Sequence, residues 1–204
     1  MYSPSAFVEH DLAVLHDFIE QHSFAMLVSA GSGMPVVSHV PLLLERNAGQ
    51  GILWGHVARA NDQWKEWASG PALAVFTGPH AYISPRWYAE PHTVPTWNYV
   101  AVHATGPLTL IEDPTELLPL LARQAAFYES SATEPWTFDP ADPFFSRLAQ
   151  QIVGFRLEIA TLSGKWKLSQ NHSPTRRHRV ITALEQQHSP NSQAIAQLMH
   201  QQLP

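Results

Sequence analysis

Several short stretches of the sequence combine side chains that could bind an anion or a flat polar ligand. In "GHVARANDQW", Arg59 and Asn61 stand where a strand should end and a helix begin. The free amides of a helix N-terminus favour an anion, and an arginine beside them can donate two N–H groups to a phosphate. His56 could add a hydrogen bond. A plain helix cap with a surface arginine is the alternative, and spacing alone favours it.

A second group of candidates mixes aromatic and polar side chains. Six aromatic residues fall between positions 76 and 99: Phe76, Tyr82, Trp87, Tyr88, Trp97 and Tyr99. Most aromatic side chains pack in cores. Here, however, "ISPRWY" and "PTWNY" also carry hydroxyl, amide and guanidinium groups. This mixture suits a planar heteroaromatic ligand, which needs a stacking surface and hydrogen bonds at its edge.

The stretch "GKWKLSQN" places two lysines on one face of a strand. Lys165 and Lys167 alternate with Trp166, which therefore points to the opposite face. Ser169, Gln170 and Asn171 follow without an apolar residue among them. These three residues also fit a simple turn in which an amide side chain bonds its own backbone, so both interpretations remain open.

Other kinds of chemistry lack the residues that they require. The sequence holds no cysteine, which excludes disulfides, thiolate metal sites and a cysteine nucleophile. It holds no P-loop, no dinucleotide fingerprint and no zinc-protease or serine-hydrolase motif. Twelve histidines are present, but their spacing does not indicate a metal site, and we predict none.

Charge and composition limit the kinds of molecule that this protein is expected to bind. The net charge is −5 and the isoelectric point is near 6.1, so no general basic field attracts nucleic acid. One basic cluster, residues 176–179, is more typical of a solvated helix face than of a DNA contact. Charged residues make up only 14% of the chain, and a surface poor in charge favours a homodimer.

The absence of long apolar runs and of a signal-peptide pattern predicts a cytoplasmic protein without membrane contact.

The elements that must position these side chains can be predicted from periodicity. Strand patterns dominate residues 24–112 and 154–170, with a hairpin over 24–46, a bend at Gly106–Pro107 and a turn at Gly164. Helical patterns cover 11–22, a short segment capped by Asn61, a segment capped by Asp113, the stretch "PFFSRLAQQIV" and two tail helices. This order predicts an α+β, mainly β fold: a barrel with peripheral helices rather than a parallel βαβ sheet. We expect one domain over 1–172 and a helical extension over 173–204 packed on it.

Four of these stretches, in this order, carry a resemblance to a known family. "GHVARANDQW", "GPHAYISPRWY", "VPTWNYVAVHATG" and "GKWKLSQN", supported by "SHVPLLL", resemble the PaiB family of FMN-binding negative transcriptional regulators. The resemblance runs from about residue 1 to 184 and implies a split β-barrel related to pyridoxamine-phosphate-oxidase-like flavoproteins. It also implies a homodimer with FMN at the subunit interface.

The resemblance assigns residues to the cofactor. It implies that Arg59 is the main partner of the FMN phosphate, with His56 and Asn61 nearby, and that His39 and Val40 run along the isoalloxazine edge. The remaining cofactor-binding residues, from one or both subunits, are Thr96, Trp97, Asn98, Lys167, Ser169, Gln170 and Asn171. Two features depart from the family pattern: the loop 89–93 is short, and His172 stands where an arginine is common.

Three functions remain open at this point. The first is a negative transcriptional regulator that binds FMN, which the family implies. The second is an FMN-dependent oxidoreductase, whose cofactor would carry the chemistry and which would need no obvious catalytic dyad; His39 and His103 are its candidate proton donors. The third is a haem or small-molecule binding module, which only the histidine content supports.

Overall fold

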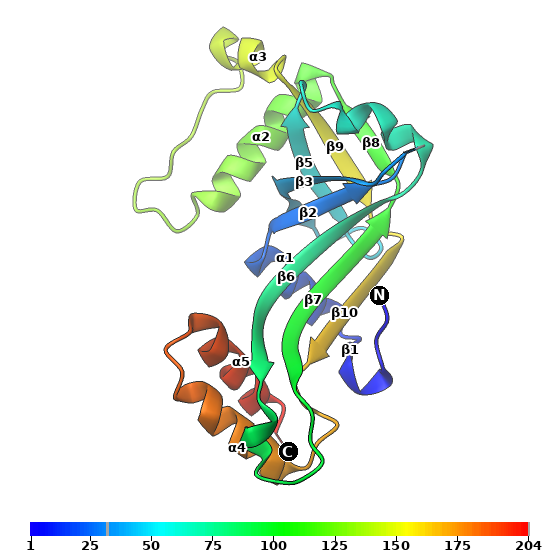
Figure 1. Cartoon of the computed structure of the whole chain (residues 1–204). Helices are drawn as coiled ribbons and strands as arrows, with labels where there is room; N and C mark the ends of the chain where they lie inside the picture. The colour runs from blue at the N-terminus through cyan, green and yellow to red at the C-terminus, as the bar shows by residue number, and fades with distance from the viewer. Residues whose placement is uncertain (32, 204) are drawn as a thin grey trace. The chain divides into compact units, whose positions relative to one another are not determined.

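The computed structural model describes residues 1–31 and 33–203 and confirms the α+β prediction. The chain forms two compact units. Unit 1 comprises Met1–Phe18, Thr77–Val102 and Ser163–Pro204, and unit 2 comprises Ile19–Phe76 and His103–Leu162. Figure 1 labels two long strands, β6 (Ala72–Ile83) and β7 (Thr96–Gly106), and the helix α1 (Leu12–Gln21). Each of these elements, and β10 (Thr161–Lys167), contributes residues to both units.

Unit 2 contains the predicted hairpin. Strands β2 (Phe24–Ser29) and β3 (Val36–Pro41) pair antiparallel along their whole length, and β2 also pairs with β6. Ser32, in the middle of the predicted turn, lies outside the described residues. Within the described sheet, β3 pairs only with β2 and forms an edge.

A second antiparallel sheet completes the strands of unit 2. It has the order β4-β5-β9-β8, with β4 at Leu43–Glu45, β5 at Ile52–Ala58, β9 at Ile152–Glu158 and β8 at Leu108–Ile111. The strand predicted over 96–112 is interrupted at Pro107, as the bend prediction required. Gly106 is needed there because a Cβ at this position would lie 1.8 Å from the backbone oxygen of Glu158.

Three helices accompany the strands of unit 2: η2 (Asp62–Ser69), α2 (Pro114–Tyr128) and α3 (Pro143–Ala149). The predicted caps are confirmed, because Asn61 accepts from the Gln63 amide and Asp113 from the Thr115 amide. Helix α3 is shorter than predicted, since β9 already begins at Ile152. Buried side chains of α2 and α3, including Leu117 and Ala149, pack into one apolar cluster.

Unit 1 is built on the strand order β1-β10-β7-β6, with β1 at Val8–Glu9 and β10 at Thr161–Lys167. The prediction of a turn at Gly164 is wrong. The turn lies between Glu158 and Thr161, and Gly164 is inside β10 opposite Glu9. A Cβ on Gly164 would lie 2.2 Å from Leu15 Cδ2, so close packing explains the glycine where a turn was expected.

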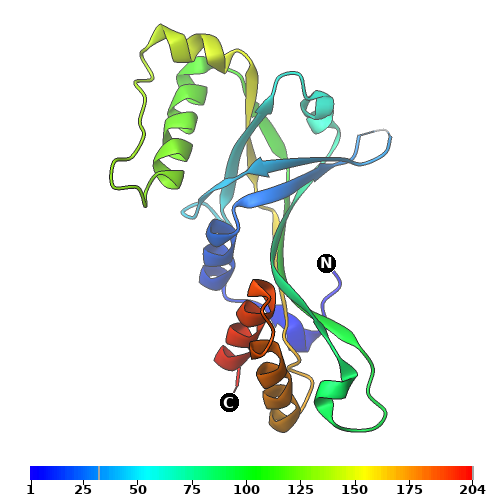
Figure 2. The same ribbon diagram turned by 60° about the vertical axis from the view of Figure 1, so that its left-hand side comes forward.

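The remaining helices of unit 1 are η1 (Ser5–Phe7), η3 (Pro85–Tyr88), α4 (Pro174–Glu185) and α5 (Pro190–Gln201). Helices α4 and α5 lie side by side (Figure 2), and α4 also packs on η3. Leu184, Ile195 and Met199 are fully buried. The two tail helices therefore pack through these side chains, while the expected division into a domain over 1–172 and an extension over 173–204 stays a prediction.

Candidate functional site

A cleft in unit 2 gathers four of the predicted cofactor residues. Its volume is about 480 Å³, and its walls come from β3, β5, the start of β9 and the residue that caps η2. We call this the strand cleft. The residues that line it are Ser38, His39, Val40, Pro41, His56, Val57, Ala58, Asn61 and Ile152.

Asn61 organises one end of the strand cleft. Its Oδ1 accepts the Gln63 amide at 3.1 Å, and its Nδ2 donates to Ser38 Oγ at 2.7 Å. The buried Gln63 then donates through Nε2 to the backbone oxygens of Leu27 and Val36. The start of η2 is thereby tied to both strands of the hairpin. Gln63 and Ser38 were not among the predicted site residues, because their roles depend on contacts distant in sequence.

The two histidines of the strand cleft differ in environment. The His56 ring is partly buried, and its Nδ1 lies 3.0 Å from Gln124 Oε1. Burial lowers the pKa of His56, although the hydrogen bond to Gln124 opposes this, so the imidazole is neutral near neutral pH. His39 is exposed and stacks near Phe24, with ring centroids 6.3 Å apart.

Arg59 does not line the strand cleft. Its Nη1 donates to Glu112 Oε1 at 2.8 Å, while its Nε and Nη2 donate to backbone oxygens of residues 150 and 152. The guanidinium also lies over the Trp64 ring, 5.9 Å from its centroid. A contact between Arg59 and the FMN phosphate stays a prediction. It requires the Arg59 guanidinium to give up its bond to Glu112 and to bind the phosphate instead.

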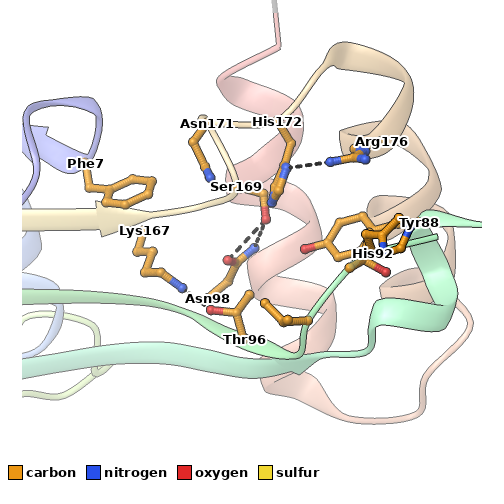
Figure 3. Close-up of a pocket in the computed structure, with 12 residues that line it drawn as sticks. Phe7, Tyr88, His92, Thr96, Asn98, Lys167, Ser169, Asn171, His172 and Arg176 are labelled. Carbon is orange, nitrogen blue, oxygen red and sulfur yellow. Dashed lines mark hydrogen bonds between the residues drawn. The ribbon is translucent and has the colours of Figure 1, made fainter. Parts of the chain in front are cut away.

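A polar pocket of about 290 Å³ in unit 1 gathers five further predicted residues (Figure 3). They are Thr96, Asn98, Lys167, Ser169 and Asn171. Trp97 and Gln170 do not line it. Gln170 instead hydrogen-bonds the backbone of its own segment, and Trp97 is 53% exposed beside Tyr82.

Cations gather around the polar pocket. The Lys167 ammonium donates to Thr96 Oγ1 and to the Trp97 backbone oxygen. Burial, and secondarily the charge on Lys165, lower the pKa of Lys167. Arg176, four residues after His172, has its Nη1 3.4 Å from the His172 Nδ1 and pairs with Glu90. A guanidinium therefore stands beside His172.

Two features of the polar pocket indicate a built binding site. Ser169 has a φ of 63°, which is rare for a residue with a side chain, and its hydroxyl exchanges hydrogen bonds with the buried Asn98 amide. The Tyr88 hydroxyl is buried and interacts with Ser169, which opposes the rise in its pKa that burial causes, but it completes no hydrogen bond of normal geometry among the described residues. Figure 3 shows it directed toward Ser169 and Asn98. An unpaired buried hydroxyl costs free energy unless a ligand or a water satisfies it.

The polar side chains of the strand cleft and of the polar pocket suit a flavin nucleotide. The strand cleft offers uncharged amide, hydroxyl and imidazole groups, which suit ribityl hydroxyls and an isoalloxazine edge, and the polar pocket offers cations and hydroxyls for an anion. The two sets lie in different units of the chain. Among the described residues, no group of three histidines and carboxylates is placed to hold a metal ion, and no helix has the length and apolarity to cross a membrane.

Comparison with known proteins agrees with this chemistry. A family model described as "Putative FMN-binding domain" matches residues 1–161. The protease synthase and sporulation protein PAI 2 of Bacillus subtilis is 34% identical and covers 100% of this chain and 98% of its own. An uncharacterised protein of Emericella nidulans is 26% identical over 98% of this chain and 97% of its own.

Solved structures share the fold at low sequence identity. The flavocytochrome Anf3 of Azotobacter vinelandii superposes with a TM-score of 0.63 at 14% identity, covering 78% of this chain and 69% of that chain. A protein of Mycobacterium smegmatis described as binding FAD and heme gives 0.61 at 15% identity, covering 78% of this chain and 73% of that chain. These neighbours establish the fold.

Fold and family together define the class as an FMN-binding protein of the split β-barrel type. The chain belongs to the FMN-binding family whose model it matches over 1–161, and it is PaiB-like along its full length.

Proposed function

We propose that this protein binds FMN with both groups of residues: those of the strand cleft and those of the polar pocket. The observation that carries the proposal is the match of residues 1–161 to an FMN-binding family, over a stretch that contains the whole strand cleft. In this proposal Asn61, His56 and Ser38 orient the cofactor, and Lys167 neutralises negative charge. Bound FMN would supply hydride and electron transfer.

The proposal includes a homodimer. In it, the polar pocket of one chain contacts the FMN that is bound in the strand cleft of the partner chain. The β2–β3 hairpin supports this with an apolar surface: Phe24 is 66%, Met34 86% and Val37 48% exposed. Val37 lies on the edge strand β3, Phe24 on the neighbouring β2 and Met34 between the two strands. Exposed apolar side chains grouped on a hairpin at a sheet edge are typical of an interaction surface.

Comparing two ligands tests the phosphate contact. FMN and riboflavin differ only in the phosphate, so a residue that binds the phosphate should affect FMN alone. We expect Arg59→Ala to weaken FMN binding by about 1.5–3 kcal/mol and to leave riboflavin binding unchanged. Lys167→Met should be titrated in parallel. Equal losses for both ligands would reject a phosphate contact for that residue, and retention of neither ligand by the wild-type protein would overturn FMN binding.

Within this proposal the cellular role is negative transcriptional regulation in the cytoplasm, as PaiB-like membership supports. The basic cluster at 176–179 gives little support to direct DNA binding. Arg176 pairs with Glu90, Arg177 is buried and donates to the Gln202 backbone oxygen, and Arg179 donates to the Tyr88 backbone oxygen. A mobility-shift assay with the protein's own upstream DNA, with and without FMN, tests the role; a complex that FMN changes would support it.

An FMN-dependent oxidoreductase is the second candidate. It is favoured by an apolar cavity that shares residues with the strand cleft and could admit a substrate. Reduction of bound FMN by NADH or NADPH, with turnover in the presence of an acceptor, would favour it over the regulator.

A further inference from the structure

A second cavity of unit 2 lies against the strand cleft. Its volume is about 530 Å³, within the range of small-molecule sites. His56, Pro41 and Ile152 line both spaces. We call it the aromatic cavity, because Trp136, Phe138 and Phe145 form one of its walls.

The aromatic wall is assembled from two segments. Trp136 and Phe138 come from the loop between α2 and α3, and Phe145 comes from α3. The Phe138 and Phe145 centroids are 4.5 Å apart, and Trp136 lies 5.6 Å from Phe138. The Trp136 amide donates to Glu129 Oε2 at 3.0 Å, which holds this part of the loop. Trp136 remains 53% exposed, so the wall offers uncovered ring surface.

The opposite wall is one face of α2. Leu121, Ala125 and Tyr128 follow one another at helical spacing, with the buried Gln124 beside them. Ala125 is the small residue of this face, and its methyl group leaves room in the cavity.

The polar groups of the aromatic cavity are neutral. Burial raises the pKa of Tyr128 and lowers that of His56, so both are uncharged near neutral pH. No lysine, arginine, aspartate or glutamate lines the cavity among the described residues. A charged ligand would therefore lose its hydration without compensation.

The hydrogen bonds also define which groups accept. Gln124 Nε2 donates to the Trp54 backbone oxygen at 3.3 Å, which leaves Oε1 to accept from His56 Nδ1–H. The His56 Nε2 is then an unprotonated acceptor. The Tyr128 hydroxyl donates to Ser23 Oγ at 3.0 Å, so its oxygen can still accept. The cavity thus offers two hydrogen-bond acceptors to a ligand and few hydrogen-bond donors.

We propose that the aromatic cavity binds a flat, uncharged aromatic molecule carrying one N–H or O–H donor. Its rings would pack between Trp136, Phe138 and α2, and its donor would reach His56 or Tyr128. Binding of this ligand does not require FMN, but a functional link between the two rests on the proposed function. If FMN occupies the strand cleft, His56, which lines both spaces, would couple the two molecules. The aromatic ligand would then be an effector of the regulator or a substrate of the flavoenzyme.

Calorimetric titration of the full chain with three probes tests the ligand class. Indole is flat, neutral and carries one N–H, benzofuran has the same shape without the donor, and benzoate is an anion. We expect indole to bind, and we expect benzofuran and benzoate each to bind at least about tenfold more weakly than indole. No indole binding, or equal binding of benzoate, would overturn the proposal.

Two neighbouring substitutions locate the site. Ala125→Trp should fill the cavity and weaken indole binding by about tenfold or more, whereas Ala126→Trp on the exposed side of the same helix should change it by less than about twofold. Ala125→Leu replaces the first variant if that one does not fold. Indole binding that is unchanged in a folded Ala125 variant would overturn the assignment.

The FMN titration separates this inference from the proposed function. A chain that binds indole at Ala125 but does not retain FMN would overturn the cofactor proposal and leave the aromatic site standing. A chain that retains FMN but not indole would do the reverse. If both bind, indole should shift the visible absorption of bound FMN, and Ala125→Trp should abolish that shift.

Discussion

At the scale of single residues, the site depends on side chains whose hydrogen-bond partners lie far away in sequence. Asn61 could be recognised as a helix cap because the cap bond reaches only to Gln63. Its second bond, to Ser38, crosses from η2 to β3 and has no local signature. The same side chain therefore has a predictable structural role and a role in the cleft that required the structure.

Replacing Asn61 should separate these two roles. Asn61→Ala removes both bonds and should lower the free energy of unfolding by about 1–2 kcal/mol. Asn61→Asp keeps the cap acceptor but loses the donor to Ser38, so it should recover most of the cap contribution while still weakening FMN binding. Urea denaturation and FMN titration measure the two effects, and equal stability of the Ala and Asp variants would contradict the cap assignment.

Tyr88 gives a prediction in which stability and binding change in opposite directions. Its buried hydroxyl faces Ser169 but completes no hydrogen bond of normal geometry among the described residues, so Tyr88→Phe should raise the stability of the ligand-free protein by about 1 kcal/mol. If the hydroxyl contacts a ligand in the polar pocket, the same change should weaken FMN binding. Thermal unfolding with and without FMN checks both signs. A Phe variant less stable than the wild type without FMN would show that the hydroxyl is already satisfied.

At the scale of elements, local sequence rules predicted most helix starts and strands but failed where packing decides. The predicted caps Asn61 and Asp113 are both observed. Gly164 was predicted as a turn because glycine is common in turns, yet it lies in β10, where Leu15 leaves no room for a side chain. In α1, which forms within the predicted helical segment 11–22, Leu15, Phe18 and Ile19 are buried, while Leu12 is 41% exposed.

The packing explanation for Gly164 can be tested with a second glycine. Gly164→Ala should destabilise the protein by about 1–3 kcal/mol, since its Cβ would lie 2.2 Å from Leu15 Cδ2 and 2.7 Å from Trp166 Cζ3. Gly70 has extended backbone and nothing within 4 Å of an added Cβ, so Gly70→Ala should have little effect. Chemical denaturation of both variants decides, and similar losses at the two positions would argue against close packing as the cause.

At the scale of the whole molecule, partly buried histidines should make stability depend on pH. Burial lowers the pKa of His22, His56, His103 and His172 below the ordinary value of 6.5. The unfolded chain then binds more protons than the folded chain between the lowered values and 6.5, so stability rises with pH in this window and falls on acidification.

Denaturation midpoints measured between about pH 7.5 and about pH 5 test this expectation, because the histidine linkage acts within that range. The free energy of unfolding should decrease as the pH falls below about 6.5. His56→Gln, which keeps a polar side chain but cannot gain a proton, should reduce the slope. A stability that does not change, or that increases on acidification, would contradict a lowered histidine pKa in the folded state.

The sequence by itself determined the local elements, the absence of cysteine chemistry and the family, because caps, strand alternation and family motifs are properties of neighbouring residues. It also indicated which residue types could meet a flavin. Only the tertiary structure decided that these residues form two sets in separate units, that Arg59 faces Glu112, and that His56 borders an aromatic cavity. Those outcomes depend on contacts between residues such as Arg59 and Glu112, 53 positions apart, and no local pattern records such contacts.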